Sequence, residues 1–328
     1  MNSFIVTGGA GFIGSNLVKQ LNESGWTDIT IVDHISEKDT AKRRNLDQLK
    51  YSEYFDKKEF RGLLNSEKIR EVDCVFHLGA CSSTTETDED YLRDNNYQYT
   101  KDLCEWSLKH GARFIYASSA ATYGDGSFGY SDSDENTLRL LPLNAYGRSK
   151  QQFDLWALQS GVSKKIVGLK YFNVYGPGED HKGDMRSIVN KAYPMILRDK
   201  KMKLFKSNRP DFKDGEQRRD FIYVDDAVEA TIFFYLHPGI NGLFNCGTGE
   251  ARTWKDLAAS IFSSMNLPLQ IEWIDMPETI REKYQYHTQA DISKLRKAGY
   301  ASPFISIEEG VRRYVTDYLI KQSENVQR

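Results

Sequence analysis

The sequence lacks several features that would point to particular classes of protein. Its four cysteines (Cys74, Cys81, Cys104 and Cys246) form no C-x-x-C pair and have no histidine cluster beside them, so we expect reduced thiols, no disulfide and no metal site. Forty-four Lys and Arg residues against 46 Asp and Glu residues leave a net charge of −2 over 328 residues. That balance excludes a global positive field for nucleic acid or an anionic membrane, and any anionic ligand must be bound by a local site.

Long apolar runs and flexible linkers are also missing. No stretch approaches the roughly 18 to 20 apolar residues of a membrane span, and the chain runs into Phe4-Ile5-Val6-Thr7 without a positively charged leader. We therefore expect a cytoplasmic protein that is neither membrane-bound nor exported. No internal repeat, low-complexity tract or run of Pro, Gly or Ser divides the chain, so its parts are expected to form one continuous body.

What the chain does contain is apolar material for a core and a repeating order of strands and helices. Hydrophobic residues make up 40% and aromatic residues 12% of the sequence, which argues against intrinsic disorder. Predicted strands lie at 3–7, 28–33, 73–78, 112–118 and 165–171, and predicted helices lie near 12–24, 88–110 and 145–160. This alternation predicts an α/β protein with a Rossmann-type, doubly wound parallel sheet.

Beyond residue 172 the alternation loosens and predicts a smaller mixed α/β lobe. We expect helices at 185–199, at 253–264 and in a tail to about 320, a polar loop at 206–218, and a strand at 219–224 that runs into a helix. The chain is therefore divided into a first domain, residues 1–172, and a second lobe, residues 173–328. Segments near 219–235 could pack back on the first domain.

A glycine-rich turn follows the first predicted strand. In Thr7-Gly8-Gly9-Ala10-Gly11-Phe12-Ile13-Gly14, three glycines (Gly8, Gly11 and Gly14) are spaced three residues apart where a helix begins. The first permits a tight turn, the second lets a pyrophosphate approach the backbone, and the third lets the helix pack on the strand. A lone glycine triplet is weak evidence, but in this strand–turn–helix context it predicts dinucleotide binding.

The residues after the second strand give opposing signals about which dinucleotide binds. Asp33 can accept hydrogen bonds from the adenosine ribose, which favours NAD because a carboxylate would repel the 2′-phosphate of NADP. A basic cluster follows closely and could pair with that phosphate: Lys42, Arg43, Arg44 and Lys57. Each of these could instead be a solvated surface charge, but together they favour NADP. Which of the three at 42–44 would meet the phosphate stays open.

A second motif, Asn144-Ala145-Tyr146-Gly147-Arg148-Ser149-Lys150, opens another predicted helix. Tyr146 and Lys150 are four residues apart and so share one face. An ammonium and a positive nicotinamide ring nearby would lower the pKa of the tyrosine, which is ordinarily about 10. Ser119 lies at the carboxyl end of the strand 112–118, where ligands bind in open α/β sheets, and could donate a hydrogen bond to a reacting oxygen. A Y-x-x-x-K pair alone is common in ordinary helices.

Together with the glycine turn and the serine, this pair resembles the extended short-chain dehydrogenase/reductase superfamily, whose members act mostly on nucleotide sugars. The resemblance implies that Tyr146 is the acid/base, that Lys150 adjusts its pKa and holds the nicotinamide ribose, and that Ser119 assists. Nucleotide-sugar 4,6-dehydratases carry an Asp-Glu pair after the serine. This chain has Ala120 and Ala121 there, which argues against dehydration.

Further segments narrow the resemblance over nearly the whole chain. The most particular are Cys81-Ser82-Ser83-Thr84-Thr85-Glu86 and the Thr-Gln-Ala-Asp block at 288–291, and the others lie at 94–99, 116–124, 171–177, 181–183, 219–226 and 284–300. Together they resemble the ADP-L-glycero-D-manno-heptose 6-epimerase family. The resemblance implies NADP-dependent inversion of C6 of an ADP-heptose, through transient oxidation to a ketone without net redox change, for lipopolysaccharide core heptose. It also implies a homo-oligomer, often a pentamer in this family.

Carried over position by position, the resemblance assigns further site residues. Lys182, in a His-Lys-Gly segment, would be the second acid/base, although without the resemblance we would interpret it as a surface-loop lysine. With Gly8, Gly11, Gly14 and Lys42 from the motifs above, NADP would be contacted by Phe12, Ile13, Asp33, His34, Lys57, Leu78, Gly79, Ala80, Cys81, Ser82, Asn95, Lys150 and Val174. The substrate would be contacted by Asn173, Asp184, Lys191, Phe205, Lys206, Ser207, Asn208, Arg219 and Tyr284. The first domain would then bind NADP and the second lobe the ADP-heptose.

Several alternatives remain open. Arg219 suits a diphosphate because a guanidinium can grip two phosphate oxygens, but it could form an ion pair with Asp225 or Asp226 instead. Contacts within 206–218 are open because the chain departs from simpler family members there. As a whole, the protein could also be a 4-epimerase that needs only Tyr146 and lets the keto-sugar rotate. A non-catalytic Rossmann protein that senses NADP or scaffolds partners is the other alternative.

Overall fold

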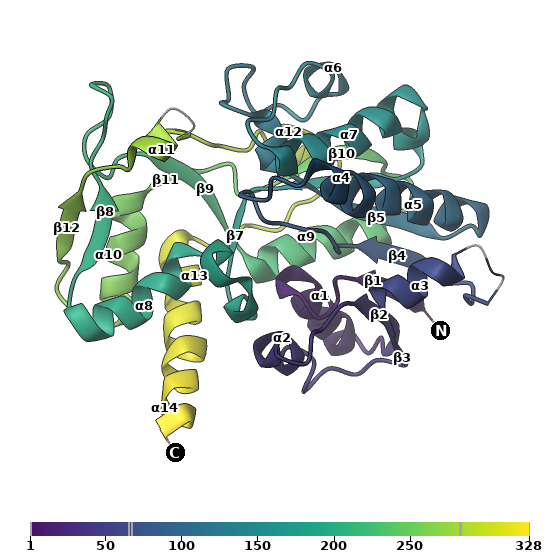
Figure 1. Ribbon diagram of the computed structural model, residues 1–328, viewed down its shortest axis with the longest axis horizontal. Helices are drawn as coiled ribbons and strands as arrows, with labels where there is room; N and C mark the ends of the chain where they lie inside the picture. Colours follow the sequence, from purple (N-terminus) through teal and green to yellow (C-terminus); the bar gives the residue numbers. More distant parts are fainter. Residues whose placement is uncertain (1, 65, 67, 282–283, 328) are drawn as a thin grey trace.

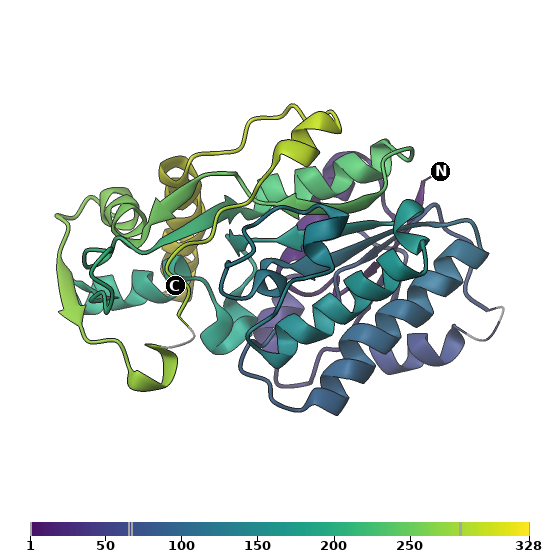
Figure 2. The same cartoon turned by 90° about the horizontal axis from the view of Figure 1, so that it is seen from above.

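The computed structural model describes residues 2–64, 66, 68–281 and 284–327. A seven-stranded parallel sheet with the order β10-β6-β5-β4-β1-β2-β3 forms the larger half of the molecule (Figure 1). Its strands are β1 (Ser3–Thr7), β2 (Asp28–Asp33), β3 (Glu53–Asp56), β4 (Cys74–His77), β5 (Arg113–Ser119), β6 (Val167–Tyr171) and β10 (Gly242–Cys246). The sheet lies between layers of helices (Figure 2), which confirms the predicted Rossmann-type, doubly wound fold.

Two separate apolar clusters cover the two faces of this sheet. Phe4 and Val6 of β1 pack into one cluster with helices α1 and α9, whereas Ile5 between them packs into the other with helices α5 and α7. Because strands covered on both sides bury every side chain, they read as continuous apolar runs in the sequence. The helices of this half are α1 (Phe12–Glu23), α2 (Thr40–Arg44), α3 (Lys57–Leu63), α4 (Glu89–Leu92), α5 (Tyr99–Lys109), α6 (Asp134–Thr137), α7 (Ala145–Gln159) and α9 (Val224–Leu236).

A smaller lobe of mixed strands and helices lies at the left of Figure 1. It contains a three-stranded sheet of order β11-β9-β7 and a two-stranded sheet of β12 and β8. Its strands are β7 (Asn173–Tyr175), β8 (Met202–Phe205), β9 (Arg218–Tyr223), β11 (Ala251–Thr253) and β12 (Ile271–Ile274). The remaining helices of the chain are α8 (Ile188–Asp199), α10 (Trp254–Ser264), α11 (Glu278–Arg281), α12 (Ser293–Lys297), α13 (Ile307–Arg312) and α14 (Lys321–Gln327).

Two segments beyond residue 172 belong to the large sheet. β10 pairs in parallel with β6, from Gly242 opposite Val167 to Cys246 opposite Tyr171. Helix α9, within the segment expected to return, packs on α1 and places Val228 and Phe234 in the same apolar cluster as Phe4. The functional division at residue 172 stays a prediction, and it is crossed by these two elements.

The structure differs from the predicted elements at several places, and strands β7, β8, β10, β11 and β12 are among the elements that were not predicted. Strand β3 was not predicted, because its four residues pair only with β2 at the edge of the sheet and two of them are exposed, so no apolar run marks it. The predicted helix over 88–110 is continuous, but its central part, Arg93–Gln98, is a π-helical turn between α4 and α5. Such turns shift the register of a helix and occur frequently at functional sites.

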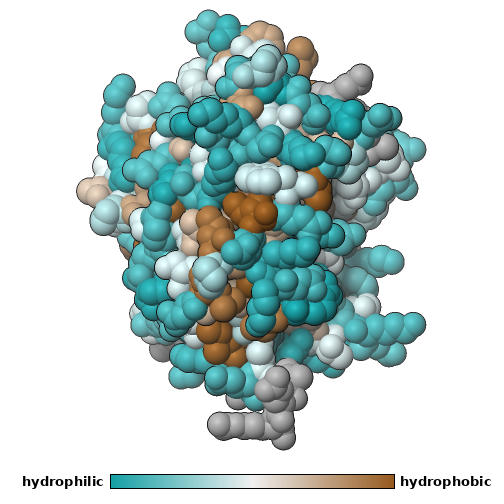
Figure 3. Space-filling view, turned by 90° about the vertical axis from the view of Figure 1, so that its left-hand side faces the viewer, coloured by the Kyte–Doolittle hydropathy of each residue, from teal (hydrophilic) through white to brown (hydrophobic). Residues whose placement is uncertain are grey.

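Apolar side chains also reach the surface. Figure 3 views the molecule from the side of the smaller lobe and shows brown, apolar surface between teal, polar side chains. Leu197 of α8 and Leu269 before β12 are each 45% exposed. No helix among the described residues is long and apolar enough to cross a bilayer. The homo-oligomer and the cytoplasmic location both stay predictions.

A buried ion pair connects α7 with β5 and β6. The ammonium of Lys170 lies 2.6 Å from Asp154 Oδ2, and both side chains are 0% exposed. Asp154 also accepts hydrogen bonds from the Tyr116 and Ser118 hydroxyls, both at 2.7 Å. Lys170 donates a further bond to Thr122 Oγ1 at 2.9 Å. Because both charges are paired and hydrogen-bonded, the desolvation penalty of burying them is offset.

Replacing Lys170 with Met should therefore destabilise the fold strongly. The substitution leaves the Asp154 carboxylate buried without a cation, and we expect the free energy of unfolding to fall by about 3–5 kcal/mol. Urea unfolding followed by circular dichroism measures it. The matched control is Lys19→Met, which removes a 60% exposed lysine that lies 3.9 Å from Glu23 on α1 and should change stability little. Equal unfolding midpoints for the two variants would contradict the structural role of the pair.

Candidate active site

The glycine turn between β1 and α1 brings three backbone segments into close contact. Gly8 has a φ of +69°, and a Cβ there would lie 2.7 Å from the amide nitrogen of Gly79. A Cβ on Gly14 would lie 2.1 Å from the carbonyl oxygen of Gly8. Only glycine permits these approaches. Since α1 also begins without a side-chain cap on its first amides, those amides are available to a phosphate group.

Asp33 ends β2, and its carboxylate is bonded on both oxygens. Oδ2 accepts from the Ala10 amide at 2.9 Å, and Oδ1 accepts from the His34 amide at 2.7 Å and from Lys42 Nζ at 2.6 Å. His34 Nδ1 lies 2.8 Å from Asp56 Oδ2. Of the basic residues on α2, Lys42 is thus the one that the structure places against Asp33, where its ammonium offsets the carboxylate charge.

The loop that follows β4 is held by the π-helical turn. Asn96 accepts a hydrogen bond from the Cys81 amide at 2.8 Å and donates one to the Cys81 carbonyl at 2.9 Å. It also donates to Ser149 Oγ of α7 at 3.0 Å. The neighbouring Asn95 accepts from Lys57 Nζ at 2.6 Å. The turn therefore joins the loop at 78–82 and Lys57, all of them predicted cofactor contacts, to helix α7, which carries Lys150.

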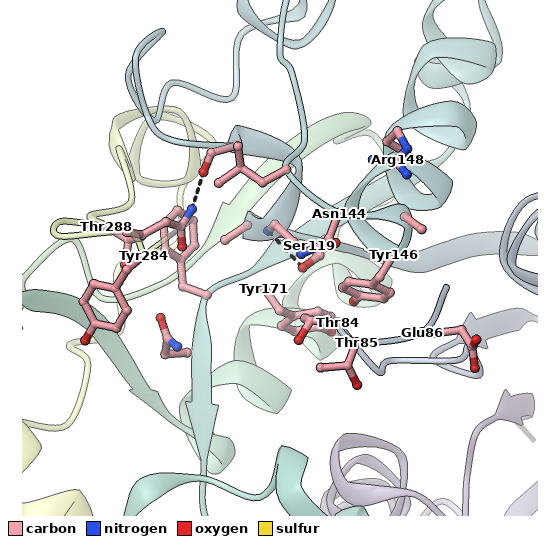
Figure 4. Close-up of a pocket in the computed structure, with 18 of the residues that line it drawn as sticks. Thr84, Thr85, Glu86, Ser119, Asn144, Tyr146, Arg148, Tyr171, Tyr284 and Thr288 are labelled. Atoms are coloured by element: carbon pink, nitrogen blue, oxygen red, sulfur yellow. Dashed lines mark hydrogen bonds between the residues drawn. The ribbon is translucent and has the colours of Figure 1, made fainter. Parts of the chain in front are cut away.

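Ser119 and Tyr146 are brought together by a close approach of α7 to the end of β5. Helix α7 begins after Asn144, whose side chain accepts from the Gly147 amide at 2.7 Å. A Cβ on Gly147 would lie 2.8 Å from the carbonyl oxygen of Ala121, so a larger residue would push the helix away. Figure 4 shows Tyr146 beside Ser119 in the resulting site.

The electrostatic environment of this pair includes a buried lysine. Lys150 is 5% exposed and donates to the Ala117 carbonyl at 2.8 Å. Burial lowers the pKa of Lys150 to about 8, against the opposite effect of the Asp154 carboxylate. Burial also raises the pKa of Tyr146, while its hydrogen bond with Ser119 lowers it. Tyr146 is therefore protonated near neutral pH unless further positive charge approaches it.

A cavity of about 360 Å³ extends from the glycine turn to Ser119 and Tyr146. Seven of the predicted cofactor contacts line it, namely Phe12, Ile13, Leu78, Ala80, Ser82, Lys150 and Val174. The other predicted cofactor contacts lie in the glycine turn, at the end of β2, in the loop after β4, and in the Lys57–Asn95 pair. Seven of the residues that the sequence assigned to one ligand thus line one cavity, and no observation places the others on its walls.

Lys182 lines the same cavity as Tyr146. It lies in a 3₁₀ turn, Asp180–Met185, and its ammonium is 5.2 Å from the centre of the Phe12 ring. The side chain is half-buried. Burial lowers the pKa of Lys182, and the Glu179 carboxylate raises it. These surroundings differ from those of a solvated surface-loop lysine.

A larger cavity of about 810 Å³ opens on the other side of Ser119 and Tyr146. Five residues line both cavities: Ser119, Tyr146, Tyr171, Phe172 and Asn173. In Figure 4, Tyr284 and Thr288 lie on one side of Ser119, and Thr84, Thr85 and Glu86 lie on the side of Tyr146. The two cavities therefore meet at Ser119 and Tyr146, two of the predicted catalytic groups.

Arg219 faces the larger cavity as a buried cation. It is 8% exposed, and its guanidinium carbon lies 5.2 Å from the Tyr284 ring centre and 5.7 Å from that of Trp254. Its guanidinium donates a hydrogen bond to the Arg218 carbonyl at 2.8 Å. Neither Asp225 nor Asp226 forms the ion pair considered above, and Asp226 instead accepts from the Ile305 amide at 2.7 Å. Burial lowers the pKa of Arg219, a cost that an anion in the cavity would relieve.

Comparison with known proteins identifies the family. The model described as "NAD dependent epimerase/dehydratase family" matches residues 4–247. An ADP-L-glycero-D-manno-heptose-6-epimerase of Nitratidesulfovibrio vulgaris (strain DP4) is 53% identical, over 96% of this chain and 98% of its own length. The chain belongs to the ADP-L-glycero-D-manno-heptose-6-epimerase family. The predicted resemblance and the isomerase class are thereby confirmed, and the cofactor is a nicotinamide nucleotide.

Solved structures with this fold include epimerases that act at different carbon atoms, so the fold alone does not determine the activity. The ADP-L-glycero-D-manno-heptose-6-epimerase of Helicobacter pylori superposes with a TM-score of 0.80, at 28% identity over 96% of each chain. A UDP-N-acetylglucosamine 4-epimerase from Methanobrevibacter ruminantium M1 also reaches 0.80, at 27% identity over 98% of this chain and 99% of its own. Enzymes that invert C6 and enzymes that invert C4 thus share this fold. The 53% sequence identity to a heptose 6-epimerase, and not the fold, assigns the chain to that family.

The predicted substrate contacts are distributed unevenly in this family member. Asn173, Arg219 and Tyr284 line the larger cavity, whereas Lys191 lines the smaller one and donates to the Asp184 carbonyl at 3.0 Å. The segment from Phe205 to Asn208 lines neither. Its groups are engaged nearby: Lys206 with Asp275 at 3.1 Å, the Ser207 amide with Asp214 at 2.7 Å, the Asn208 amide with the Tyr286 hydroxyl at 3.0 Å, and the Phe205 ring 6.3 Å from that of Tyr284.

Several residues of the site were not among the predicted contacts. The larger cavity is also lined by Thr84, Thr85, Glu86, Arg148, Gln285 and Thr288, and Asn96 holds the loop at 78–82. Most of them fall inside segments that carried the family resemblance, and that resemblance was the sequence signal by which they could have been predicted. Trp254, which packs on Arg219 from the start of α10, had no such signal because it lies outside those segments.

The close approach at the glycine turn yields a direct test. Gly14→Ala places a methyl group 2.1 Å from the Gly8 carbonyl oxygen, so α1 must move off the strand and the nucleotide should bind at least about tenfold more weakly. Fluorescence titration with NADPH measures this. The matched control is Gly62→Ala in α3, where an added Cβ meets nothing within 4 Å and binding should be unchanged. Wild-type affinity in Gly14→Ala would show that the turn does not form the nucleotide cradle.

Proposed function

We propose that the protein converts ADP-D-glycero-β-D-manno-heptose to ADP-L-glycero-β-D-manno-heptose with NADP, and that Tyr146 and Lys182 are the two acid/base groups at C6. The product would supply the heptose of lipopolysaccharide core. The observation that carries the proposal is the placement of both side chains on one cavity that continues from the glycine turn to the substrate side.

Substrate orientation follows from the larger cavity. Arg219 is a buried cation without a carboxylate partner among the described residues, and a guanidinium can bind two oxygens of a diphosphate at once. With the ADP diphosphate there, the sugar extends toward Ser119 and Tyr146, which line the same cavity. Thr84, Thr85 and Glu86 offer hydroxyl and carboxylate groups to the sugar on the side of Tyr146.

Proton transfer at C6 is the task of the chain's own groups. A bound nicotinamide supplies reversible hydride transfer to and from C6. Tyr146 takes the proton of the C6 hydroxyl as the carbon is oxidised, Ser119 donates a hydrogen bond to that oxygen, and the Lys150 ammonium favours the tyrosinate. Inversion presents the oxygen in two orientations, so a second group is needed. Lys182 supplies it from the smaller lobe's side of the cavity.

The preference for NADP rests on Lys42. Its ammonium lies 2.6 Å from Asp33 Oδ1 and 2.8 Å from the His34 carbonyl, at the end of β2 where the adenosine ribose is expected. The carboxylate that would repel a 2′-phosphate is thus offset by a cation in contact with it. Lys57, bound to Asn95, adds a second ammonium in this region.

Tyr146→Phe and Lys182→Ala should each lower kcat by about 10²- to 10⁴-fold, since each removes one acid/base group. Incubation with ADP-D-glycero-β-D-manno-heptose, followed by NMR of the C6 configuration, measures the inversion. The nucleotide released on denaturation should remain NADP in Lys182→Ala, which shows that the variant is folded.

The alternatives give different outcomes in the same assay. Full activity in Lys182→Ala would sink the two-base mechanism and favour a single tyrosine, as in a 4-epimerase. Inversion of a UDP-hexose in place of the ADP-heptose would overturn the substrate assignment. No inversion of either sugar by the wild-type protein would favour a non-catalytic NADP-binding protein.

Lys42→Ala should reverse the cofactor preference. The change removes the cation beside Asp33, so NADPH should lose at least about tenfold in affinity relative to NADH. Titrations with both nucleotides give the ratio. Arg43→Ala on the same helix is the matched control and should keep the ratio. If Arg43→Ala, and not Lys42→Ala, changes it, the phosphate contact belongs to Arg43. A wild-type preference for NADH would refute NADP altogether.

A further inference from the structure

Glu179, three residues before Lys182, is a fully buried carboxylate, 0% exposed. Oε1 accepts hydrogen bonds from the Ser187 hydroxyl at 2.5 Å and from the Tyr314 hydroxyl at 3.0 Å. Oε2 accepts from the Ser187 backbone amide. No lysine or arginine among the described residues forms an ion pair with it within 4.0 Å. Burying a carboxylate charge without a cationic partner costs folding free energy, so this placement needs an explanation other than stability.

The donors around Glu179 favour its ionised form. The Tyr314 hydroxyl accepts from Asn190 Nδ2 at 2.8 Å, and the Ser187 hydroxyl accepts from the Asn190 amide at 3.3 Å. Both hydroxyl protons therefore point to Glu179, and a third bond comes from a backbone amide, which can only donate. Burial raises the pKa of Glu179 above its ordinary value, and the hydrogen bonds from Ser187 and Tyr314 together with the Lys182 charge oppose that rise in part.

This carboxylate is joined to Lys182 through a short turn. The Glu179 carbonyl accepts from the Lys182 amide at 2.9 Å, and Gly183, with a φ of +54°, follows the lysine directly. Asp180, which follows Glu179, accepts hydrogen bonds from Asn190 Nδ2 and from Gln322 Nε2 of α14, both at 2.8 Å. The turn that carries Lys182 is thus fixed by α8 and by the C-terminal helical segment.

We propose that Glu179 is a positioning residue for Lys182: held by Ser187 and Tyr314, it fixes the turn that presents the lysine to the cavity and supplies a negative charge to its ammonium. The inference rests on the proposed role of Lys182 as the second acid/base. A neutral Gln at this position could hold the turn through its carbonyl oxygen alone. The ionised carboxylate adds an electrostatic effect on the lysine that an amide cannot supply.

The other titratable groups that face Lys182 cannot replace this charge. The walls of its cavity contribute Tyr146 and Lys150 on α7, with Arg186 and Lys191 at the start of α8, and none of these carries a negative charge when protonated. Its own turn contributes His181 and two further carboxylates, Asp180 and Asp184. Asp180 is bonded to Asn190 and Gln322, and of the three carboxylates Glu179 is the one whose charge raises the pKa of Lys182. Burial lowers the pKa of Lys182 and Glu179 raises it, so loss of the carboxylate charge should lower the pKa of Lys182 further.

Glu179→Gln tests the proposal with two readouts. We expect kcat to fall about tenfold, KM for ADP-D-glycero-β-D-manno-heptose to change little, and the limb of the pH profile that belongs to Lys182 to move roughly one unit lower. The second readout needs no turnover. In the holoenzyme with ¹³C-methylated lysines, the NMR resonance that is missing in Lys182→Arg should titrate at lower pH in Glu179→Gln.

Two further variants separate charge from structure. Glu179→Asp keeps the charge and should keep the Lys182 titration near that of the wild type even if kcat falls. Tyr314→Phe removes one hydrogen bond from the carboxylate and should lower kcat several-fold at unchanged KM, which keeps the test available if Glu179→Gln does not fold. The control is Tyr318→Phe, whose hydroxyl lies 3.4 Å from Asp180 and does not bond Glu179, and which should behave as wild type.

The outcomes distinguish this proposal from the one on which it rests. An unchanged Lys182 titration in folded Glu179→Gln, or an unchanged kcat in Tyr314→Phe, overturns the role of Glu179. Full activity in Lys182→Ala overturns the two-base mechanism instead, while the lysine resonance still reports whether Glu179 acts on Lys182.

Discussion

The Asp154 carboxylate is the interaction on which the geometry of the site depends. It lies on α7, two turns beyond Tyr146 and one beyond Lys150, and it binds Tyr116 and Ser118 of β5 and Lys170 of β6. The helix that carries the tyrosine and the lysine is therefore fixed against the strand that ends in Ser119. Because the carboxylate is fully buried, none of these bonds competes with water. A shift of α7 would break several of them together, so the three groups keep their relative positions.

Positive charge is concentrated where a ligand with several phosphates would bind, although the chain as a whole carries a net charge of −2. Lys150, Lys182 and Arg219 are each at least partly buried around the two cavities, and burial lowers the pKa of all three. In a site with little water, each cation interacts more strongly with an anion than it would at the surface. A near-neutral protein can thus bind a dinucleotide and a nucleotide sugar without a basic face that would attract nucleic acid.

Local patterns in the sequence predicted the parts of the site that are local in structure. The glycine turn and the Tyr146–Lys150 pair are short segments whose spacing follows from strand, turn and helix geometry. Asn96 and Trp254 could not be predicted in this way, because their roles depend on Cys81 and Arg219, to which they are joined only by the fold. The same holds for β3, which is a strand only because β2 lies beside it. The role of Lys182 came from family resemblance, since a lysine in a polar loop has no distinguishing local pattern.

In the proposed mechanism the two lobes contribute differently, because the two orientations of the reacting oxygen need separate partners. Tyr146 and Ser119 come from the large sheet and its helix α7, whereas Lys182 comes from a turn held by α8 and the C-terminal segment. The fold itself is shared with a 4-epimerase, whose TM-score of 0.80 equals that of a 6-epimerase. In the proposed mechanism, Lys182 is the group that separates two-base inversion at C6 from a mechanism with a single tyrosine. Glu179 and Tyr314 matter to that proposal, because their hydrogen bonds hold the turn from which Lys182 lines the cavity.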